Sequence, residues 1–289
     1  MRPGAKARVT GYSSMQSLRY FPLTGRLTWM VLLLVFGLGV LLGSRSDQRG
    51  SGARADEDFY PAWAAKARYN QPLWVRDTDS ALGRMNLQPK QLSLRDLARV
   101  HGHLCDGLVI SWVEIKVLLH RLFPQGVADR TDLRAIAKNG PCWADAAGWM
   151  TGGRVNHGTR VLDNAVGDGF VVQRISTGEA FRVWLKPGVF PADLANLERS
   201  IRIRRGAGEQ VNPGEIDRFE ALAADFSQRL LNTSPETVVE VEPVNNFVFP
   251  TYSPSLIAQR SDIINRDVSR ARGMGHGRGS ENLGARRNR

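Results

Sequence analysis

A run of residues near the N-terminus, Leu27 to Ser44, carries no charged side chain and strongly restricts how this chain can fold. Its sequence, LTWMVLLLVFGLGVLLGS, is apolar on every helical face and just long enough to cross a bilayer core. The residues before it include basic side chains and no acidic ones, whereas acidic side chains follow it from Asp47 onward. This asymmetry predicts a single-pass helix with a cytoplasmic N-terminus.

Two interpretations of this run compete. It is either an uncleaved signal anchor at 27–44 or a signal peptide with its cleavage site at Ala53–Ala55. The basic leader at 1–26 is long and that site lies far from the apolar run, so we favour the anchor. The prediction is a bacterial-type inner-membrane protein whose C-terminal domain is periplasmic. A buried helix of a globular domain is the third alternative.

Polar segments delimit one folded domain. Residues 45–58 are polar and contain glycine, which is typical of a linker. Residues 263–289 form a basic tail that we expect to be disordered, because it has few apolar side chains to offset ordering entropy. The domain is therefore predicted over 59–262. Much of the net charge of +11 lies at the chain ends, so we expect no nucleic-acid partner.

Local patterns within the domain predict an α+β fold, with helices packed on a small antiparallel β-sheet. Ser93 and Asp96 have the spacing of a capping box, and a second apolar-periodic helix ends near Pro124. Further helices are predicted to start near Pro141 and Pro213. The predicted strands lie in the segments TRVLDN, GFVVQRI, AFRVWLK, ETVVEVEP and NFVFP.

Metal-binding side chains are concentrated between the first two predicted helices. The stretch RVHGHLCDGLV contains His101, His103 and Cys105, and the only other cysteine, Cys142, stands three residues before Asp145. Imidazole and thiolate suit zinc and similar ions. On a helix His101 and Cys105 share a face, so the spacing predicts two of these three side chains with one distant ligand. A carboxylate such as that of Asp145 would then orient a histidine.

Spacing alone leaves two other interpretations open. In an oxidising compartment Cys105 and Cys142 would form a disulfide, or act as a thiol/disulfide redox pair. Alternatively, the histidines are helix-end residues that bind no metal. The HxHxC pattern is not a standard structural-zinc signature, so it does not decide between these interpretations.

The same residues resemble a known family. HGHLCDGLV is similar to the His-Gly-His-x-Cys-Pro-Gly signature of the E-type subunit family of formylmethanofuran dehydrogenase, and CWADAAGWMTGGRVNHGT is similar to that family's second block. The similarity covers about residues 90 to 190. It implies an α+β domain that binds zinc or a similar divalent ion. By position, the implied metal ligands are His101, His103, Cys105 and Cys142.

Departures from the family pattern add further candidate residues. Asp106 stands in place of the signature proline, Gly153 stands where a cysteine is common, and His157 follows it. We take Asp106, Asp145 and His157 as candidates for orienting the ligands or for acid–base chemistry. No catalytic residue is assigned.

The sequence thus predicts a membrane-anchored, zinc-binding protein that binds or acts on a small anionic ligand at the metal. Arg154 and Arg160 flank the glycine-rich turn and could attract such a ligand. The alternatives are a non-catalytic accessory or assembly module with a structural metal, and a thiol/disulfide redox protein using Cys105 and Cys142. A redox-complex partner and a homodimer are further expectations, and enzymatic activity is left open.

Overall fold

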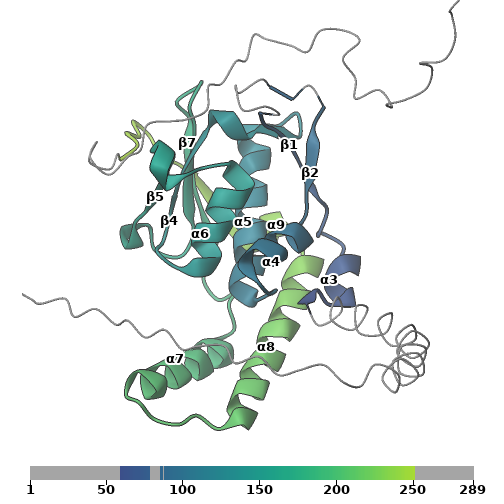
Figure 1. Ribbon diagram of the computed structural model, residues 1–289, viewed down its shortest axis with the longest axis vertical. Coiled ribbons are helices and arrows are strands. Elements are labelled where there is room, and N and C mark those ends of the chain that lie inside the picture. Colours follow the sequence, from purple (N-terminus) through teal and green to yellow (C-terminus); the bar gives the residue numbers. More distant parts are fainter. Residues whose placement is uncertain (1–58, 79–84, 87, 251–289) are drawn as a thin grey trace, which may run out of the picture. The chain divides into compact units, whose positions relative to one another are not determined.

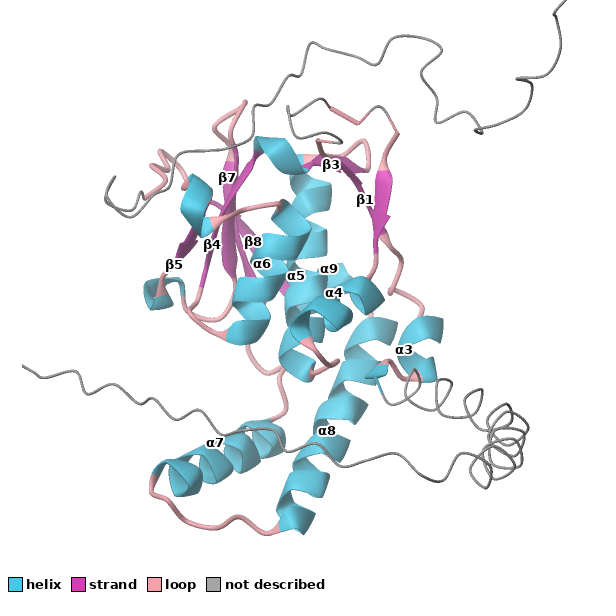
Figure 2. Ribbon diagram, in the orientation of Figure 1, coloured by secondary structure: helices cyan, strands magenta, loops and turns pink. Residues whose placement is uncertain are grey.

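The structure is a computed structural model that describes residues 59–78, 85, 86 and 88–250, and these form an α+β fold (Figures 1 and 2). The helices are α3 (Ala62–Lys66), α4 (Leu94–His101), α5 (Asp106–Leu122), α6 (Pro141–Thr151), α7 (Ala192–Gly206), α8 (Pro213–Asn232) and α9 (Pro235–Val238). The strands are β1 (Leu73–Arg76), β2 (Lys90–Leu92), β3 (Val127–Asp129), β4 (Leu133–Ala137), β5 (Arg160–Leu162), β6 (Phe170–Arg174), β7 (Ala180–Leu185) and β8 (Val239–Pro243). Short 3₁₀ turns occupy Arg130–Asp132, Val155–His157 and Asn164–Val166.

The strands form two sheets. The larger has five strands in the order β5-β4-β6-β7-β8, and the smaller has three in the order β2-β1-β3. Pairing in the larger sheet is antiparallel except between β4 and β5, and β1 pairs with β3 in parallel. The predicted purely antiparallel sheet was therefore wrong, because β4 separates β5 from β6 and supplies a parallel neighbour.

Helix α5 is the centre of the core. Its sequence is apolar on nearly all faces, which is the pattern of a helix surrounded by other elements. Trp112, Ile115 and Leu118 are completely buried. The helix contacts β6, β7 and β8 of the larger sheet on one side, and α6 and α8 on others (Figure 1). Its position fixes where its N-terminus, and so Cys105, can lie.

Local capping signals set the helix ends. The Ser93 hydroxyl accepts a hydrogen bond from the Asp96 backbone N–H, and the Asp96 carboxylate accepts one from the Ser93 N–H, which is the predicted capping box. Gly102 ends α4 at φ 100°, a left-handed conformation that glycine adopts without steric cost. The chain therefore turns sharply between α4 and α5.

One predicted strand is absent and one is shortened. Within the described residues, the segment NFVFP forms no strand, although Phe249 is buried in a small cluster against Val171 and Val161. ETVVEVEP divides into α9 and β8, because Pro235 begins a helical turn before the strand starts at Val239. β-rich composition predicted both strands, but strand formation also depends on packing and on a partner edge.

The prediction of a transmembrane helix is corrected. Among residues 59–78, 85, 86 and 88–250, no helix is sufficiently long and apolar to cross a bilayer. The predicted anchor at 27–44 lies outside the described residues, as do the linker at 45–58 and the tail at 263–289. The fold class is therefore corrected to α+β without that helix. The inner-membrane localisation with a periplasmic domain rested on the helix and is withdrawn.

Candidate metal centre

The candidate site lies where three helix ends meet. His101 is the last residue of α4, Cys105 is the N-cap of α5, and Cys142 is the second residue of α6. Pro141 begins α6 because its fixed φ suits the first helical position and its missing N–H is not needed there. Two consecutive helices and one distant helix thus bring their polar ends to one point.

Three ligand atoms lie close together at this point. The Cys105 and Cys142 Sγ atoms are 3.4 Å apart, and they lie 3.9 Å and 3.7 Å from the His101 Nε2 atom. A tetrahedral zinc ion with bonds of about 2.0 to 2.3 Å requires its ligand atoms to be separated by about 3.4 to 3.8 Å. Both cysteines are free. The residues present therefore fit one zinc-like ion with little movement.

Asp145 holds the histidine ring in place. Its Oδ2 atom is 2.8 Å from the His101 Nδ1 atom, and the imidazole side chain is only 5% exposed. An Nδ1–H that donates to this carboxylate leaves the Nε2 lone pair directed at the two thiols. A carboxylate behind a metal-binding histidine is a recurrent arrangement that fixes its tautomer and raises its basicity.

His103 stands at the edge of the site. Its ring centroid is 4.8 Å from that of His101, and it is exposed. One ligand atom from each of His101, His103 and Cys105 can be chosen so that all lie within 4.8 Å of one another. His103 is thus placed as the most accessible donor of the set, whereas Cys105 and Cys142 are half-buried.

The two thiols share a proton. The pKa of the Cys142 thiol is lowered, because the Cys105 thiol stabilises its thiolate through a hydrogen bond. The pKa of Cys105 is raised, because it provides that hydrogen bond and is buried. Both lie at helix N-termini, where free N–H groups and the macrodipole favour negative charge. Cys142 is therefore the first of the pair to become a thiolate.

Gly107 permits the close approach of α5 to α6. A Cβ atom at this position would lie 3.0 Å from the Cys142 Sγ atom and 3.3 Å from its Cβ atom. Such distances are shorter than ordinary van der Waals contact, so a side chain here would displace the thiol. The sequence showed Gly107 only as a turn residue. Its packing role depends on a residue 35 positions away and has no local signal.

Gly107→Ala is expected to weaken metal binding and to lower the free energy of unfolding by about 1 to 3 kcal/mol, the usual cost of inserting a methyl group into a filled contact. Chelator competition and urea denaturation measure the two effects. Gly206→Ala is the matched control, because nothing lies within 4 Å of a Cβ atom at that helical position. Equal metal affinity in the Gly107 and Gly206 variants would contradict the packing role.

The other predicted site residues lie apart from the three donors. Asp106 is the first residue of α5, and burial raises the pKa of its carboxyl group. His157 belongs to the 3₁₀ turn Val155–His157 and is not part of the His101, His103 and Cys105 group. Arg160 donates to the Ala144 carbonyl 2.8 Å away, so it braces α6.

A cavity of about 500 Å³ adjoins the site. Sequence reasoning did not find it, because α3 and α8 are far from the motif in sequence. Its lining has aromatic and acidic side chains but no lysine or arginine, and Arg154 is not part of it. The lining includes Trp63 from α3, His103, Cys105 and Asp106 from the junction, and Phe219 and Glu220 from α8.

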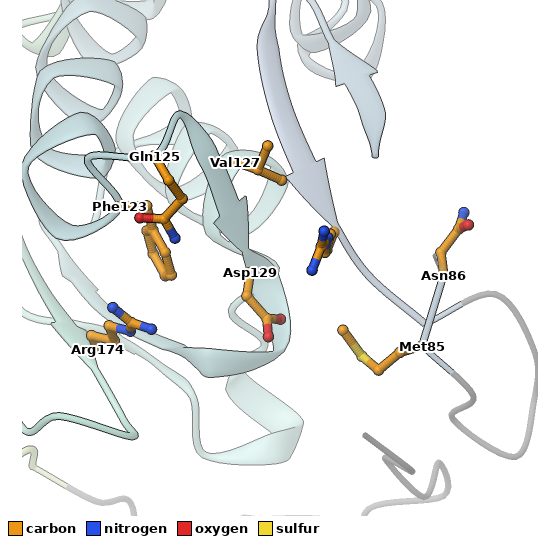
Figure 3. Close-up of a pocket in the computed structure, with 8 residues that line it drawn as sticks. Met85, Asn86, Phe123, Gln125, Val127, Asp129 and Arg174 are labelled. Carbon is orange, nitrogen blue, oxygen red and sulfur yellow. The ribbon is translucent and has the colours of Figure 1, made fainter. Parts of the chain in front are cut away.

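Another pocket, of about 330 Å³, lies between the small sheet and the end of α5. Figure 3 shows Met85 and Asn86 on the side opposite Phe123 and Arg174. None of the predicted site residues lines it. The guanidinium of Arg174 is engaged by the Asp132 carboxylate at 3.0 Å, so we assign this pocket no role in the metal centre.

Comparison with known proteins identifies the domain. A family model described as FmdE, molybdenum formylmethanofuran dehydrogenase operon, matches residues 100–240. The matched range includes the three donors and Asp145. No curated protein matches the chain. The resemblance seen in the two motif blocks is confirmed, and residues 100–240 of this chain are a domain of the FmdE family.

Proposed function

We propose that this domain binds one divalent ion of the zinc type at the junction of α4, α5 and α6. The ligands are His101 Nε2, Cys105 Sγ and Cys142 Sγ, with His103 as the fourth. The observation that carries the proposal is the triangle of donor atoms with sides of 3.4, 3.7 and 3.9 Å. A soft donor set of two thiolates and imidazole favours zinc over magnesium or calcium.

The protein's own residues would prepare the site for the ion. Asp145 fixes the His101 ring, and the N-termini of α5 and α6 stabilise the thiolates. A bound ion of this kind supplies Lewis acidity to any group that reaches a free coordination position. His103 controls that position: it closes the site when it binds the ion and leaves one place open when it turns away.

The adjoining cavity bears on what could reach the ion. Because its lining contains Asp106 and Glu220 and no basic side chain, a small anionic ligand would have to be held by the ion itself. A closed four-ligand site would instead make this a structural metal in an accessory or assembly module. The predicted redox-complex partner and homodimer stay proposals.

The test is elemental analysis of the full chain purified without chelator, combined with a count of free thiols under denaturing, metal-chelating conditions. We expect about one equivalent of zinc and two free thiols, because the ion keeps the sulfur atoms apart from each other's chemistry. Absence of metal with no free thiols would replace the proposal with a Cys105–Cys142 disulfide. Absence of metal with both thiols free would leave only a thiol pair.

A further inference from the structure

A second cavity, separate from the thiols, has the features of a binding site. Its volume is about 780 Å³, and it is bounded by α5, the start of α6, the end of β7 with the loop after it, and α7. Trp143, Trp184 and Phe190 give it an aromatic lining. Neither its position nor its lining was apparent from the motifs. Of the metal-site candidates, none lines it.

Glu114 lines this cavity as an unpartnered acid. Its residue exposure is 1%, and neither Oε1 nor Oε2 has a hydrogen-bond partner. Burial raises the pKa of this carboxyl group to about 8, and the nearby backbone N–H of Leu185 offsets only part of that effect. A buried polar group without a partner costs free energy, so its retention calls for an explanation.

The other charged side chains of the lining are already engaged. Lys138 pairs with Asp168 at 2.5 Å, and Arg202 pairs with Glu198 at 2.6 Å. Lys186 donates to two backbone carbonyl oxygens, each 3.1 Å away. Glu114 is therefore the lining residue whose charge nothing in the described chain neutralises.

The lining also shows which kind of group it accepts. The Lys138 Nζ atom lies 3.7 Å from the centroid of the Trp143 ring, a cation–π contact. The Trp143 Nε1 atom is buried without a partner, so it can donate to a bound molecule. An aromatic lining with one unpaired carboxyl group is complementary to a cation that carries N–H donors and an apolar body.

We propose that this cavity binds a small organic cation, an amidine, guanidine or amine, whose N–H groups pair with Glu114 and whose apolar part lies against Trp184 and Phe190. An amidinium or guanidinium presents two N–H groups that match the two carboxylate oxygens. The inference does not depend on the metal centre, since the two sites share no lining residue.

Binding should be coupled to ionisation of Glu114. The carboxyl group must lose its proton to pair with the cation, so affinity should rise by up to about tenfold per pH unit below pH 8 and then level off. Glu114 is influenced by Asp168, which raises its pKa, and by Lys138, which lowers it. Glu198, Arg202 and Lys186 also face the cavity, and their mutual pairing or backbone contacts keep their charges constant over this range.

The test is calorimetric titration of the full chain with benzamidine, with benzamide as the neutral isostere and benzoate as the anionic one. We expect benzamidine to bind about 10- to 100-fold more tightly than benzamide at pH 8, and benzoate not to bind. Glu114→Gln should remove this preference and the pH dependence. Glu179→Gln, which changes an exposed glutamate in the β6–β7 turn, should preserve both.

Two further results are informative. Phe190→Leu should weaken benzamidine and benzamide alike, because it removes only apolar contact, and this variant serves if Glu114→Gln fails to fold. Equal affinity for benzamidine and benzamide, absence of saturable benzamidine binding, or unchanged binding by Glu114→Gln would each overturn the proposal.

Discussion

Cys142→Ser is expected to abolish stoichiometric zinc binding by the purified chain. A serine hydroxyl stays protonated at neutral pH and is a poor ligand for zinc, so the site loses one of its two thiolates. Cys142 is also the thiol whose pKa is lowered by its neighbour, so it is the first to offer a thiolate. Elemental analysis and competition with a chromophoric chelator measure the loss, and far-UV circular dichroism checks the fold.

Graded variants separate ligands from supporting residues. Asp145→Asn retains the size of the side chain that contacts the His101 Nδ1 atom but removes its charge. It should lower zinc affinity by only about 10- to 100-fold, the range seen when a group behind a ligand is changed. His103→Ala should lower affinity if this exposed ring is the fourth ligand. Unchanged occupancy would remove His103 from the ligand set.

The outcome against the proposal is equally definite. If Cys142→Ser retained about one equivalent of zinc, the donor triangle would not be the metal site. A loss of zinc in Asp145→Asn as complete as in Cys142→Ser would mean instead that the carboxylate binds the ion or that His101 is not held without it.

Elements with strong local signals were predictable. The capping box at Ser93, the proline at position 141 and the apolar stripe after Asn212 each define a helix end through neighbours within one turn. Helix α7 had no such signal, because only Leu194 of its residues is buried. The smaller sheet was missed because β1 pairs with β3, which follows it only after two helices. Such pairing is decided by tertiary packing.

The site was predictable to a similar degree. The i, i+4 spacing of His101 and Cys105 and the recurrence of Cys142 before Asp145 indicated which side chains could meet. The real path differs from a continuous helix, because Gly102 ends α4 and Cys105 caps α5. What no local pattern could supply was the contact of Gly107 with Cys142, which depends on how α5 and α6 pack.

Glu114 had no sequence signal at all. It stands within the apolar helix α5, where a single acidic residue could equally have faced solvent. Only its burial and its lack of a partner distinguish it. A local rule broken at one position of an otherwise consistent helix is a frequent mark of function.

Glu114→Gln is expected to stabilise the protein at alkaline pH and to leave it nearly unchanged at pH 5. The pKa of this carboxyl group is about 8 in the folded chain and 4.5 in the unfolded chain. Because the folded-state pKa is the higher, the stabilising contribution is complete below pH 4.5 and is lost as the pH rises through 8. The total is on the order of 3 to 5 kcal/mol, and glutamine does not titrate.

Urea denaturation of the metal-loaded wild type and Glu114→Gln at pH 5.5, 7 and 8.5 measures this difference, with Glu179→Gln as the exposed control. Release of metal or titration of the thiols affects both proteins alike and cancels in the comparison. The same pH dependence in both proteins would mean that Glu114 titrates normally. A cationic ligand in the cavity would supply the missing charge partner, so benzamidine should stabilise the wild type most at pH 8.5 and have little effect on Glu114→Gln.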